Sequence, residues 1–413
     1  MSAAPAAITF PESPEVRAAA EKAFDRGLCP ECFGRLFGRW GHGLSNPDRT
    51  GRLAEWLGRP GAPAAGPCPL CRGAFDRLDL WVERCLDAAR PWEWHRFSCG
   101  SRWDPEILAQ EETIWAEIGS AWGESARGAF NRELGKRIEA RTGAAGGPDR
   151  PDLVLVADLL LGRVEVTVLP VYVRGRYRKF DRTIPQTRWP CRRCRGRGCD
   201  RCGGTGKMYP DSVEELVGRP FLAATGGEET RFHGMGREDI DARMLGRGRP
   251  FVLEVERPRT RGLDLPTLAA AVKESAQGRV EVSDLTIATG ADVLRVKEAS
   301  PEKSYQVVVT GEVAVAKINE ALSLVTGRAI AQRTPTRVAH RRADRVRTRR
   351  IVAARLVSAE PGRFTLDLRA EAGTYIKEWV EGDGGRTDPS LAQLLGVPLA
   401  VESLDVLEIH DTE

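Results

Sequence analysis

Residues 232–251 read FHGMGREDIDARMLGRGRPF, and this segment decides how the rest of the chain is interpreted. Asp239 and Asp241 lie between Arg237 and Arg243 in a stretch rich in glycine. Two interpretations fit: a solvated turn with alternating charges, or a cleft that holds one carboxylate for chemistry. Glycine lets another backbone approach closely, and arginine binds phosphates. The second interpretation therefore implies a polyanionic substrate.

The composition is that of a globular protein with one strongly basic segment. Hydrophobic residues make up 41% of the 413 residues and charged residues 29%, and the formal net charge is only +4. Residues 333–350 hold eight arginines and a single aspartate, Asp344. Cations clustered in a chain of modest net charge are typical of one polyanion-binding face, although a solvated charged helix also fits.

The sequence shows no sign of membrane insertion or export. No segment reaches the roughly 18 to 20 consecutive apolar residues of a membrane span. The first residues, MSAAPAAITFPESPEVR, lack the basic and apolar regions of a secretory signal. We expect a cytoplasmic protein without a membrane partner, in which cysteines are thiols or metal ligands rather than disulfides.

Eight of the ten cysteines form C-x-x-C pairs, and two such pairs complete a four-sulfur zinc site. The first predicted structural zinc site consists of Cys29, Cys32, Cys68 and Cys71, with unpaired thiols as the alternative. The second consists of Cys191, Cys194, Cys199 and Cys202. This second cluster resembles the zinc-binding repeats of DnaJ-type co-chaperones, although their pairs are farther apart. An iron–sulfur cluster and a disulfide-prone knuckle stay open there. Cys85 and Cys99 are expected to be buried thiols.

The first half of the chain indicates an α/β module. Apolar residues recur at helical spacing over residues 104–141, which predicts a long helix or a helix pair broken near Gly123. Residues 151–173 predict two strands joined by a tight turn near Gly162.

Residues 174–189, RGRYRKFDRTIPQTRW, interleave cations with aromatic side chains. Arg174, Arg176 and Arg178 are predicted to hold RNA phosphates while the aromatics stack on bases; an ordinary exposed hairpin is the alternative. The predicted domains are residues 1–190, a zinc-binding RNA-binding domain; 191–215, a cysteine-rich linker; and 216–413, a catalytic domain.

The second half predicts more strands than helices, without regular alternation, and hence an α+β domain with a largely antiparallel sheet. The expected strands are 251–257, 279–288, 305–311, 345–359, 363–371 and 399–409, and the expected helices are 263–277, 313–327 and 388–396. The sequence has neither a P-loop nor a dinucleotide fingerprint between a strand and a helix. It therefore demands no organic cofactor.

Several motifs carry a resemblance to pseudouridine synthases. G-R-E-D at 236–239 resembles their G-R-T-D, and AGTYIKEWV at 372–380 resembles their SGTYIRSL. Together with the cysteine pairs, GRYRKFDRTIPQTRW, TGKMYPDSVEEL and RTPTRVAHRRADRVR, they run in order from residue 29 to about 400. The whole chain resembles the archaeal and eukaryotic enzymes that modify positions 54 and 55 of the tRNA T arm, and its cysteine linker resembles the archaeal branch.

The resemblance implies a pseudouridine synthase fold with a mixed, largely antiparallel sheet, plus an N-terminal α/β domain that contains a THUMP module and zinc. The implied catalytic residues are Asp239 as nucleophile, Tyr305 stacked on the target uracil, and Lys377 as the cation beside Asp239. Further implied substrate contacts are Tyr375, Ile376 and Leu404. Arg237, next to the nucleophile, is expected to fill the space left by a flipped base or to hold its phosphate. Asp241 and Arg243 are expected to form a structural ion pair, with direct catalysis as the alternative.

The predicted function is a tRNA pseudouridine synthase, an isomerase that acts on the T arm with structural zinc, no organic cofactor and no obligate protein partner. A non-catalytic zinc-dependent RNA-binding or co-chaperone module is the alternative. The joint presence of Asp239, Tyr305 and Lys377 favours the enzyme, because a carboxylate repels phosphate and a binding module has no use for it. The choice between positions 54 and 55, the metal of the second cluster, the oligomeric state and the acylal or glycal route stay open.

Overall fold

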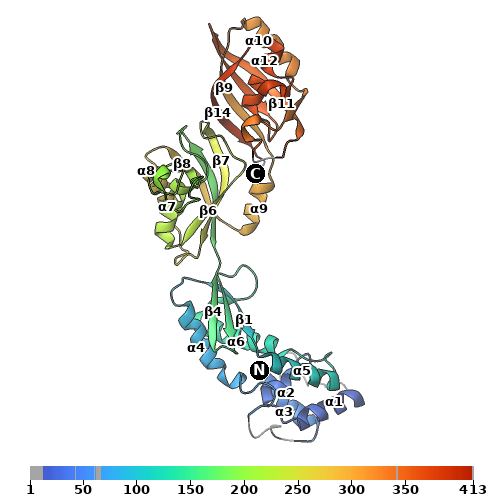
Figure 1. Cartoon of the computed structure of the whole chain (residues 1–413). Helices are drawn as coiled ribbons and strands as arrows, with labels where there is room; N and C mark the ends of the chain where they lie inside the picture. The colour runs from blue at the N-terminus through green and yellow to red at the C-terminus, as the bar shows by residue number, and fades with distance from the viewer. Residues whose placement is uncertain (1–12, 42, 60, 62–66, 341–342, 412–413) are drawn as a thin grey trace, which may run out of the picture. The chain divides into compact units, whose positions relative to one another are not determined.

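The computed structural model describes residues 13–41, 43–59, 61, 67–340 and 343–411 of the 413-residue chain. The chain forms two compact units that divide between Leu169 and Pro170, and Figure 1 labels their helices and strands. Among the described helices, none combines the length and the apolarity needed to cross a lipid bilayer.

The first unit holds a small sheet covered by helices. Its helices are α1 (Pro14–Asp25), α2 (Pro30–Arg35), α3 (Asn46–Trp56), α4 (Leu78–Ala89), α5 (Pro105–Ile118) and α6 (Ala126–Thr142). Its strands are β1 (Arg96–Arg102), β2 (Ala145–Gly146), β3 (Leu153–Asp158) and β4 (Arg163–Val168), in the order β2-β1-β3-β4. β1 is parallel to β2 and β3, and β4 is antiparallel to β3. Helices α4 and α6 pack against each other and against the sheet.

The apolar periodicity of residues 104–141 does produce a helix pair. The side chain of Asp104 caps the N-terminus of α5, and that of Ser125 caps α6. Gly143, with φ of 71°, ends α6 in the left-handed conformation that glycine adopts at low cost. The predicted helix pair and the predicted strand pair around Gly162 are confirmed.

The second unit is built on one large sheet. Its strands are β5 (Val171–Lys179), β6 (Glu229–Gly234), β7 (Arg243–Glu256), β8 (Val280–Ala288), β9 (Glu302–Thr310), β10 (Ala329–Arg333), β11 (Val346–Glu360), β12 (Arg363–Ala370), β13 (Thr387–Asp388) and β14 (Ala400–His410). The strand order is β13-β10-β11-β12-β9-β14-β7-β5-β8, and β6 pairs with β7. Within its described residues, β14 and β7 are the one parallel pair. The expected mixed, largely antiparallel sheet is confirmed.

Six helices accompany this sheet among the described residues: α7 (Val213–Thr225), α8 (Leu265–Ser275), α9 (Gly290–Glu298), α10 (Val315–Val325), α11 (Ile376–Glu381) and α12 (Leu391–Leu395). Helices α7 and α8 pack on each other and on β8, whereas α10, α11 and α12 pack together with β11 and β14. In Figure 1 the two groups cover different ends of the sheet.

Strand β5 lies in the second unit, contrary to the domain boundary expected at residue 190. It is inserted between β7 and β8 and pairs with both. The compact units consequently divide before Pro170. The prediction placed β5 with the preceding strands because they follow one another in sequence, but strand pairing depends on contacts that are distant in the chain.

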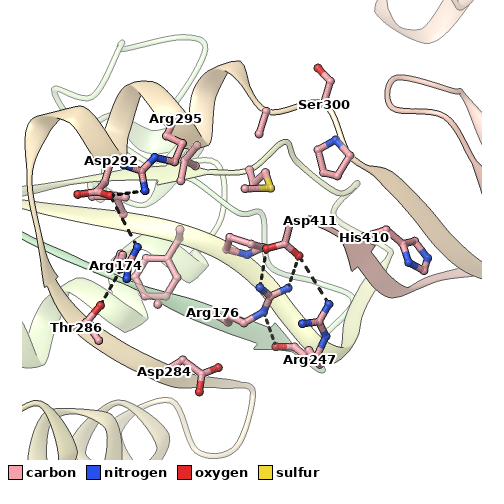
Figure 2. A pocket seen from close by; sticks show the side chains of 18 residues that line it. Arg174, Arg176, Arg247, Asp284, Thr286, Asp292, Arg295, Ser300, His410 and Asp411 are labelled. Atoms are coloured by element: carbon pink, nitrogen blue, oxygen red, sulfur yellow. Dashed lines mark hydrogen bonds and ion pairs between the residues drawn. The ribbon is translucent and has the colours of Figure 1, made fainter. Parts of the chain in front are cut away.

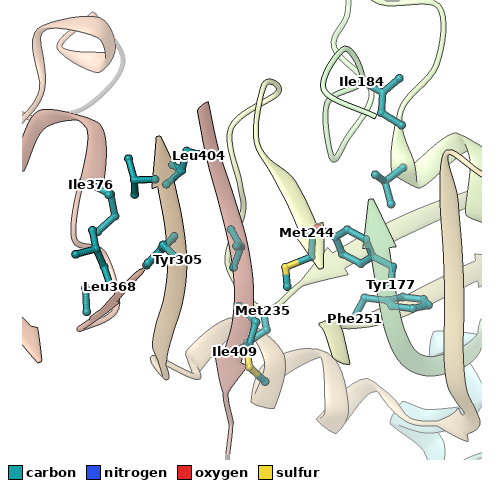
Figure 3. Close-up of a cluster of buried hydrophobic side chains, with 14 of the residues drawn as sticks. Tyr177, Ile184, Met235, Met244, Phe251, Tyr305, Leu368, Ile376, Leu404 and Ile409 are labelled. Atoms are coloured by element: carbon teal, nitrogen blue, oxygen red, sulfur yellow. The ribbon is translucent and has the colours of Figure 1, made fainter. Parts of the chain in front are cut away.

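The core of the second unit contains aromatic and sulfur side chains from strands on both sides of the parallel pair (Figure 3). Phe232 of β6 stacks on Phe251 of β7 at a centroid distance of 4.9 Å, and the Tyr177 ring meets both edgewise. Tyr305 of β9, only 8% exposed, belongs to the same core. Stacked and edgewise rings hold such positions rigidly.

Candidate active site

The opening segment folds as the end of β6, a loop over residues 235–242 and the start of β7. Glu238 ties this loop to β7, because its buried carboxylate forms an ion pair with Arg249. The hydroxyl of Tyr177 donates to the same carboxylate at 2.8 Å. A buried charge requires this degree of pairing. Glu238 therefore anchors the loop, and the side chain of the neighbouring Asp239 is partly exposed, at 35%.

A buried lysine fixes the loop backbone. The Nζ atom of Lys179 donates to the carbonyl oxygens of Ile240 at 2.8 Å and Asp239 at 3.3 Å. It also donates to the carbonyl of Ile184 at 3.0 Å. Burial lowers the pKa of Lys179, and nearby carboxylates counteract part of that effect. Lys179 thus serves the loop conformation rather than an RNA contact.

Two cations flank the carboxylate of Asp239. The Nη1 atom of Arg337 donates to its Oδ1 at 3.1 Å, and the Nζ atom of Lys377 lies 3.9 Å from its Oδ2. Arg337 also pairs with Glu378. Burial opposes the charge on Arg337, but its bonds to Glu378 and Asp239 raise its pKa above the ordinary value. Sequence reasoning did not identify Arg337, which lies in the arginine-rich segment but in no recognisable catalytic motif.

Asp241 and Arg243 do not pair with each other, so that expectation is wrong. Lys377 bonds both carboxylate oxygens of Asp241, at 2.9 and 2.6 Å, while Arg243 pairs with Asp405 of β14. The reason is the parallel register, which sets Asp405 opposite Arg243. Burial raises the pKa of Asp241, but its bond to Lys377 outweighs burial and leaves that pKa below its usual value.

A cavity of about 550 Å³ opens beside Asp239. The seven residues predicted to surround the reaction all line it: Arg237, Asp239, Tyr305, Tyr375, Ile376, Lys377 and Leu404. Burial and the charge of Asp239 raise the pKa of Tyr305 to about 12, against the opposing effect of Arg249. The phenol therefore stays protonated at neutral pH and presents an uncharged ring to the cavity.

The segment that carries Lys377 is positioned by a buried amide. Gln332 of β10, only 1% exposed, accepts from the backbone nitrogen of Tyr375 at 2.9 Å and donates to its carbonyl at 3.0 Å. These two bonds fix the point where α11 begins. Residues of β9, α11, β14 and the loop before β7, far apart in sequence, therefore meet in one cavity.

The three arginines predicted to contact phosphates, Arg174, Arg176 and Arg178, do not line the cavity beside Asp239. Arg176 is 4% exposed and makes two bonds to Asp411, at 2.8 and 2.9 Å, as Figure 2 shows. Arg174 bonds Thr286, and Arg178 forms an ion pair with Glu281. A buried guanidinium already paired with a carboxylate has no free face for phosphate, so Arg176 is corrected to a structural residue.

The other two arginines, Arg174 and Arg178, are exposed and have different neighbours. The side chain of Arg174 is 53% exposed and that of Arg178 44% exposed. Arg174 lines the separate cavity drawn in Figure 2, beside the ion pair of Asp292 and Arg295. An RNA role for these two arginines stays a prediction.

Both predicted cysteine clusters come together. Within each cluster of four, the sulfur atoms lie within 4.8 Å of one another, so each can hold a metal ion. The sulfurs of Cys29 and Cys71 are 3.7 Å apart, and those of Cys199 and Cys202 are 3.8 Å apart. A tetrahedral zinc with bonds of about 2.3 Å requires sulfur–sulfur distances of about 3.8 Å. Cys85 is buried and Cys99 partly buried, outside both clusters.

The comparisons with known proteins cover most of the chain. Residues 172–410 match the family model "Pus10, C-terminal", and residues 81–158 match "Pus10 THUMP domain, archaeal". The tRNA pseudouridine synthase Pus10 of Methanothermobacter marburgensis is 44% identical over 393 residues, 94% of this chain and 96% of that protein. That of Methanothrix thermoacetophila is 40% identical over 415 residues, 92% of this chain and 91% of that protein. The chain belongs to the Pus10 family.

Membership in the Pus10 family confirms the expected enzyme class, a pseudouridine synthase and hence an isomerase. It also confirms the THUMP module, whose matched residues lie in the first unit, and it does not support a non-catalytic module. A chain in the "Crystal Structure of a Cbf5-Nop10-Gar1 Complex" matches with a TM-score of 0.30 and 20% identity, over 48% of this chain and 46% of that chain.

Proposed function

We propose that this chain isomerises uridine to pseudouridine in the T arm of tRNA, at position 54, position 55 or both. The observation that carries the proposal is the carboxylate of Asp239, held between Arg337 and Lys377 at the edge of a cavity of about 550 Å³ lined by Tyr305. The family relatives are named tRNA pseudouridine synthases. A cavity of this size accommodates a nucleoside.

Asp239 is the proposed nucleophile. Isomerisation breaks the bond from C1′ to N1, rotates the uracil and rejoins it to the sugar through C5, with no redox step. The carboxylate of Asp239 either attacks C1′ or assists elimination to a glycal. Arg337 and Lys377 lie beside that carboxylate and balance its negative charge when the substrate excludes water. The reaction as proposed requires no organic cofactor.

The apolar walls and Tyr305 are proposed to retain the uracil while it is detached. The ring of Tyr305 stacks on one face of the base, with Ile376 and Leu404 along the sides of the same cavity. A base inside the folded T arm must first be flipped out, which costs a few kcal/mol. Arg237, exposed beside Asp239, is proposed to hold the displaced backbone.

The two cysteine clusters are proposed to bind structural zinc. Four thiolates close the coordination sphere of the ion, so neither site has an open position for substrate. Bound zinc would crosslink α2 to the loop before α4 in the first unit, and the two ends of residues 191–202 in the second. Its contribution is therefore to stability and not to the isomerisation.

The proposal is tested by treating unmodified tRNA with the purified chain and mapping pseudouridine by carbodiimide treatment and primer extension. We expect product at position 54 or 55, and loss of each signal when that uridine is replaced by cytidine. Product only outside the T arm would overturn the substrate assignment. The same signals in the Asp239→Asn variant would overturn the assignment of the nucleophile.

A further inference from the structure

A second cavity, of about 270 Å³, adjoins the first at the proposed nucleophile. The two cavities share six residues: Gln186, Arg237, Glu238, Asp239, Arg337 and Lys377. Because Asp239 belongs to both linings, the two compartments adjoin at this residue. The mechanism described above uses only the compartment that contains Tyr305.

The second cavity has its own aromatic wall. Trp189 and Tyr209 line it, both partly exposed, with ring centroids 5.7 Å apart and planes at 80°. The guanidinium of Arg237 lies over the indole of Trp189, 5.7 Å from the ring centroid. The side chain of Arg237, the residue before Glu238, thus extends toward the aromatic pair. Aromatic faces with an adjacent arginine form the surface on which unstacked nucleobases bind.

The aromatic pair sits at the base of the second cysteine cluster. The backbone nitrogen of Met208 donates to the carbonyl of Trp189 at 2.9 Å, and Pro190 forms a β-bridge with Lys207. The four sulfurs begin directly beyond this bridge, at Cys191. Trp189 and Tyr209 therefore lie at the two ends of one closed loop, which the Met208–Trp189 bond and the Pro190–Lys207 bridge hold together.

We propose that the cavity of Trp189 and Tyr209 binds the nucleobase next to the target uridine in the same RNA strand. This inference rests on the proposed function. The adjoining nucleotide is covalently linked to the target, so it must lie beside Asp239 when the target sugar does. The linking phosphate then faces Arg237 and Arg337, which line both cavities. A volume of about 270 Å³ admits one base and little more.

The second cavity explains how the protein could bind the base next to its target when two successive uridines are substrates. Positions 54 and 55 are adjacent, so the one on the side of the second cavity is the bound neighbour when the other is the target; when it is itself the target, the cavity holds the next nucleotide of the strand. Stacking on an aromatic face tolerates any base, since every base has a π-face. The second cavity therefore accepts a neighbouring uridine or pseudouridine alike, without base-specific hydrogen bonds.

The test is a double-mutant cycle between the indole and the neighbouring base. The full chain carrying Asp239→Asn is titrated with unmodified tRNA, and with tRNAs that are abasic at the nucleotide 5′ or 3′ of the target. Trp189→Ala is expected to weaken binding about 5- to 150-fold, the range of one base–aromatic stack. In the chain with Trp189, an abasic site on one side of the target should weaken tRNA binding by a similar factor. In the Trp189→Ala chain, the same abasic site should cause little further loss of affinity. Trp189→Phe should restore most of the affinity.

Two controls separate the possible failures. An abasic site in the anticodon arm should leave both affinities unchanged. Multiplicative losses, or no loss from an abasic neighbour on either side with Trp189 intact, would overturn the inference; the second result does not depend on how the Trp189 variants fold. Pseudouridine formation by the chain with Asp239 intact is measured in parallel, so failure of the proposed function is recognised separately.

Discussion

Arg337 makes the short contact with Asp239, at 3.1 Å, whereas Lys377 lies 3.9 Å away and bonds Asp241 more closely, at 2.6 Å. Positive and negative side chains therefore alternate in the order Asp241, Lys377, Asp239, Arg337 and Glu378. Lys377, the cation that the family motif places beside the proposed nucleophile, is therefore shared with a second aspartate. Arg337 orients the carboxylate of Asp239, and Glu378 orients Arg337.

Removal of Arg337 is predicted to slow the chemical step more than it weakens binding. Arg337→Ala should lower the single-turnover rate at saturating tRNA about 10²-fold, because a displaced reacting group costs that order of magnitude. Arg337→Lys should recover part of the rate, since a lysine restores the charge but not the two-sided bonding. Arg363→Ala is the matched control, because Arg363 forms an exposed ion pair with Glu402 and neither residue lines either cavity. An unchanged rate in Arg337→Ala would rule out this positioning role.

Asp239→Asn is predicted to abolish product and to leave tRNA affinity within a few-fold. The amide keeps the size of the side chain but cannot attack C1′, and a carboxylate contributes nothing favourable to phosphate contact. Asp241→Asn should retain measurable turnover, because Asp241 acts only through Lys377. Comparable turnover in both variants would move the nucleophile away from Asp239.

The sequence revealed elements and motifs but not the pairings between distant segments. The strands expected at 305–311, 363–371 and 399–409 correspond to β9, β12 and β14, and Asp239, Tyr305 and Lys377 from the quoted motifs line one cavity. Nothing local distinguishes Glu238, a buried anchor, from Asp239, its partly exposed neighbour. Likewise Arg176 has the sequence context of a phosphate ligand, and only the position of Asp411 shows that it is paired.

Lys303 is predicted to give the cavity a pH-dependent charge. Burial, with a smaller effect of Arg249, lowers the pKa of Lys303 from 10.5 to about 8, and Lys303 lines the cavity of Tyr305. Below pH 8 it is charged and attracts the phosphates of the RNA; above pH 8 it is neutral. The affinity for tRNA should therefore fall as the pH rises through about 8, measured with the Asp239→Asn chain. Lys303→Met should remove this component, whereas Lys317→Met, on the exposed side of α10, should keep it.

The same group affects folding with the opposite sign. The unfolded chain holds the proton of Lys303 up to the ordinary pKa of 10.5, while the folded chain releases it near pH 8. Between these values the unfolded state binds more protons, so this group makes folding more favourable as the pH rises. Its destabilising effect is fully present below pH 8. Lys303→Met should accordingly raise the free energy of unfolding more at pH 7 than at pH 10; an equal change at both would contradict the lowered pKa.

Metal analysis of the purified chain is predicted to find about two zinc ions, one for each cluster. Cys68→Ser and Cys199→Ser should each reduce the content to about one. Cys68→Ser should also destabilise the first unit severely, because a structural zinc contributes about 10 kcal/mol or more. Cys85→Ser is the control, since Cys85 is buried but belongs to neither cluster. Folded and active protein without any metal would refute the zinc assignment.

Truncation is predicted to separate the two possible domain boundaries. A chain of residues 170–413 keeps β5 between β7 and β8 and should unfold cooperatively on its own. A chain that begins at residue 211 loses β5, so the facing edges of β7 and β8 have no partner and Phe251 loses its contact with Tyr177. Unpaired edges and exposed apolar side chains favour aggregation. Thermal unfolding followed by circular dichroism should show a single transition for the longer chain and none for the shorter one. A cooperative transition in the shorter chain would restore the boundary near residue 190 and show that β5 is dispensable to the catalytic fold.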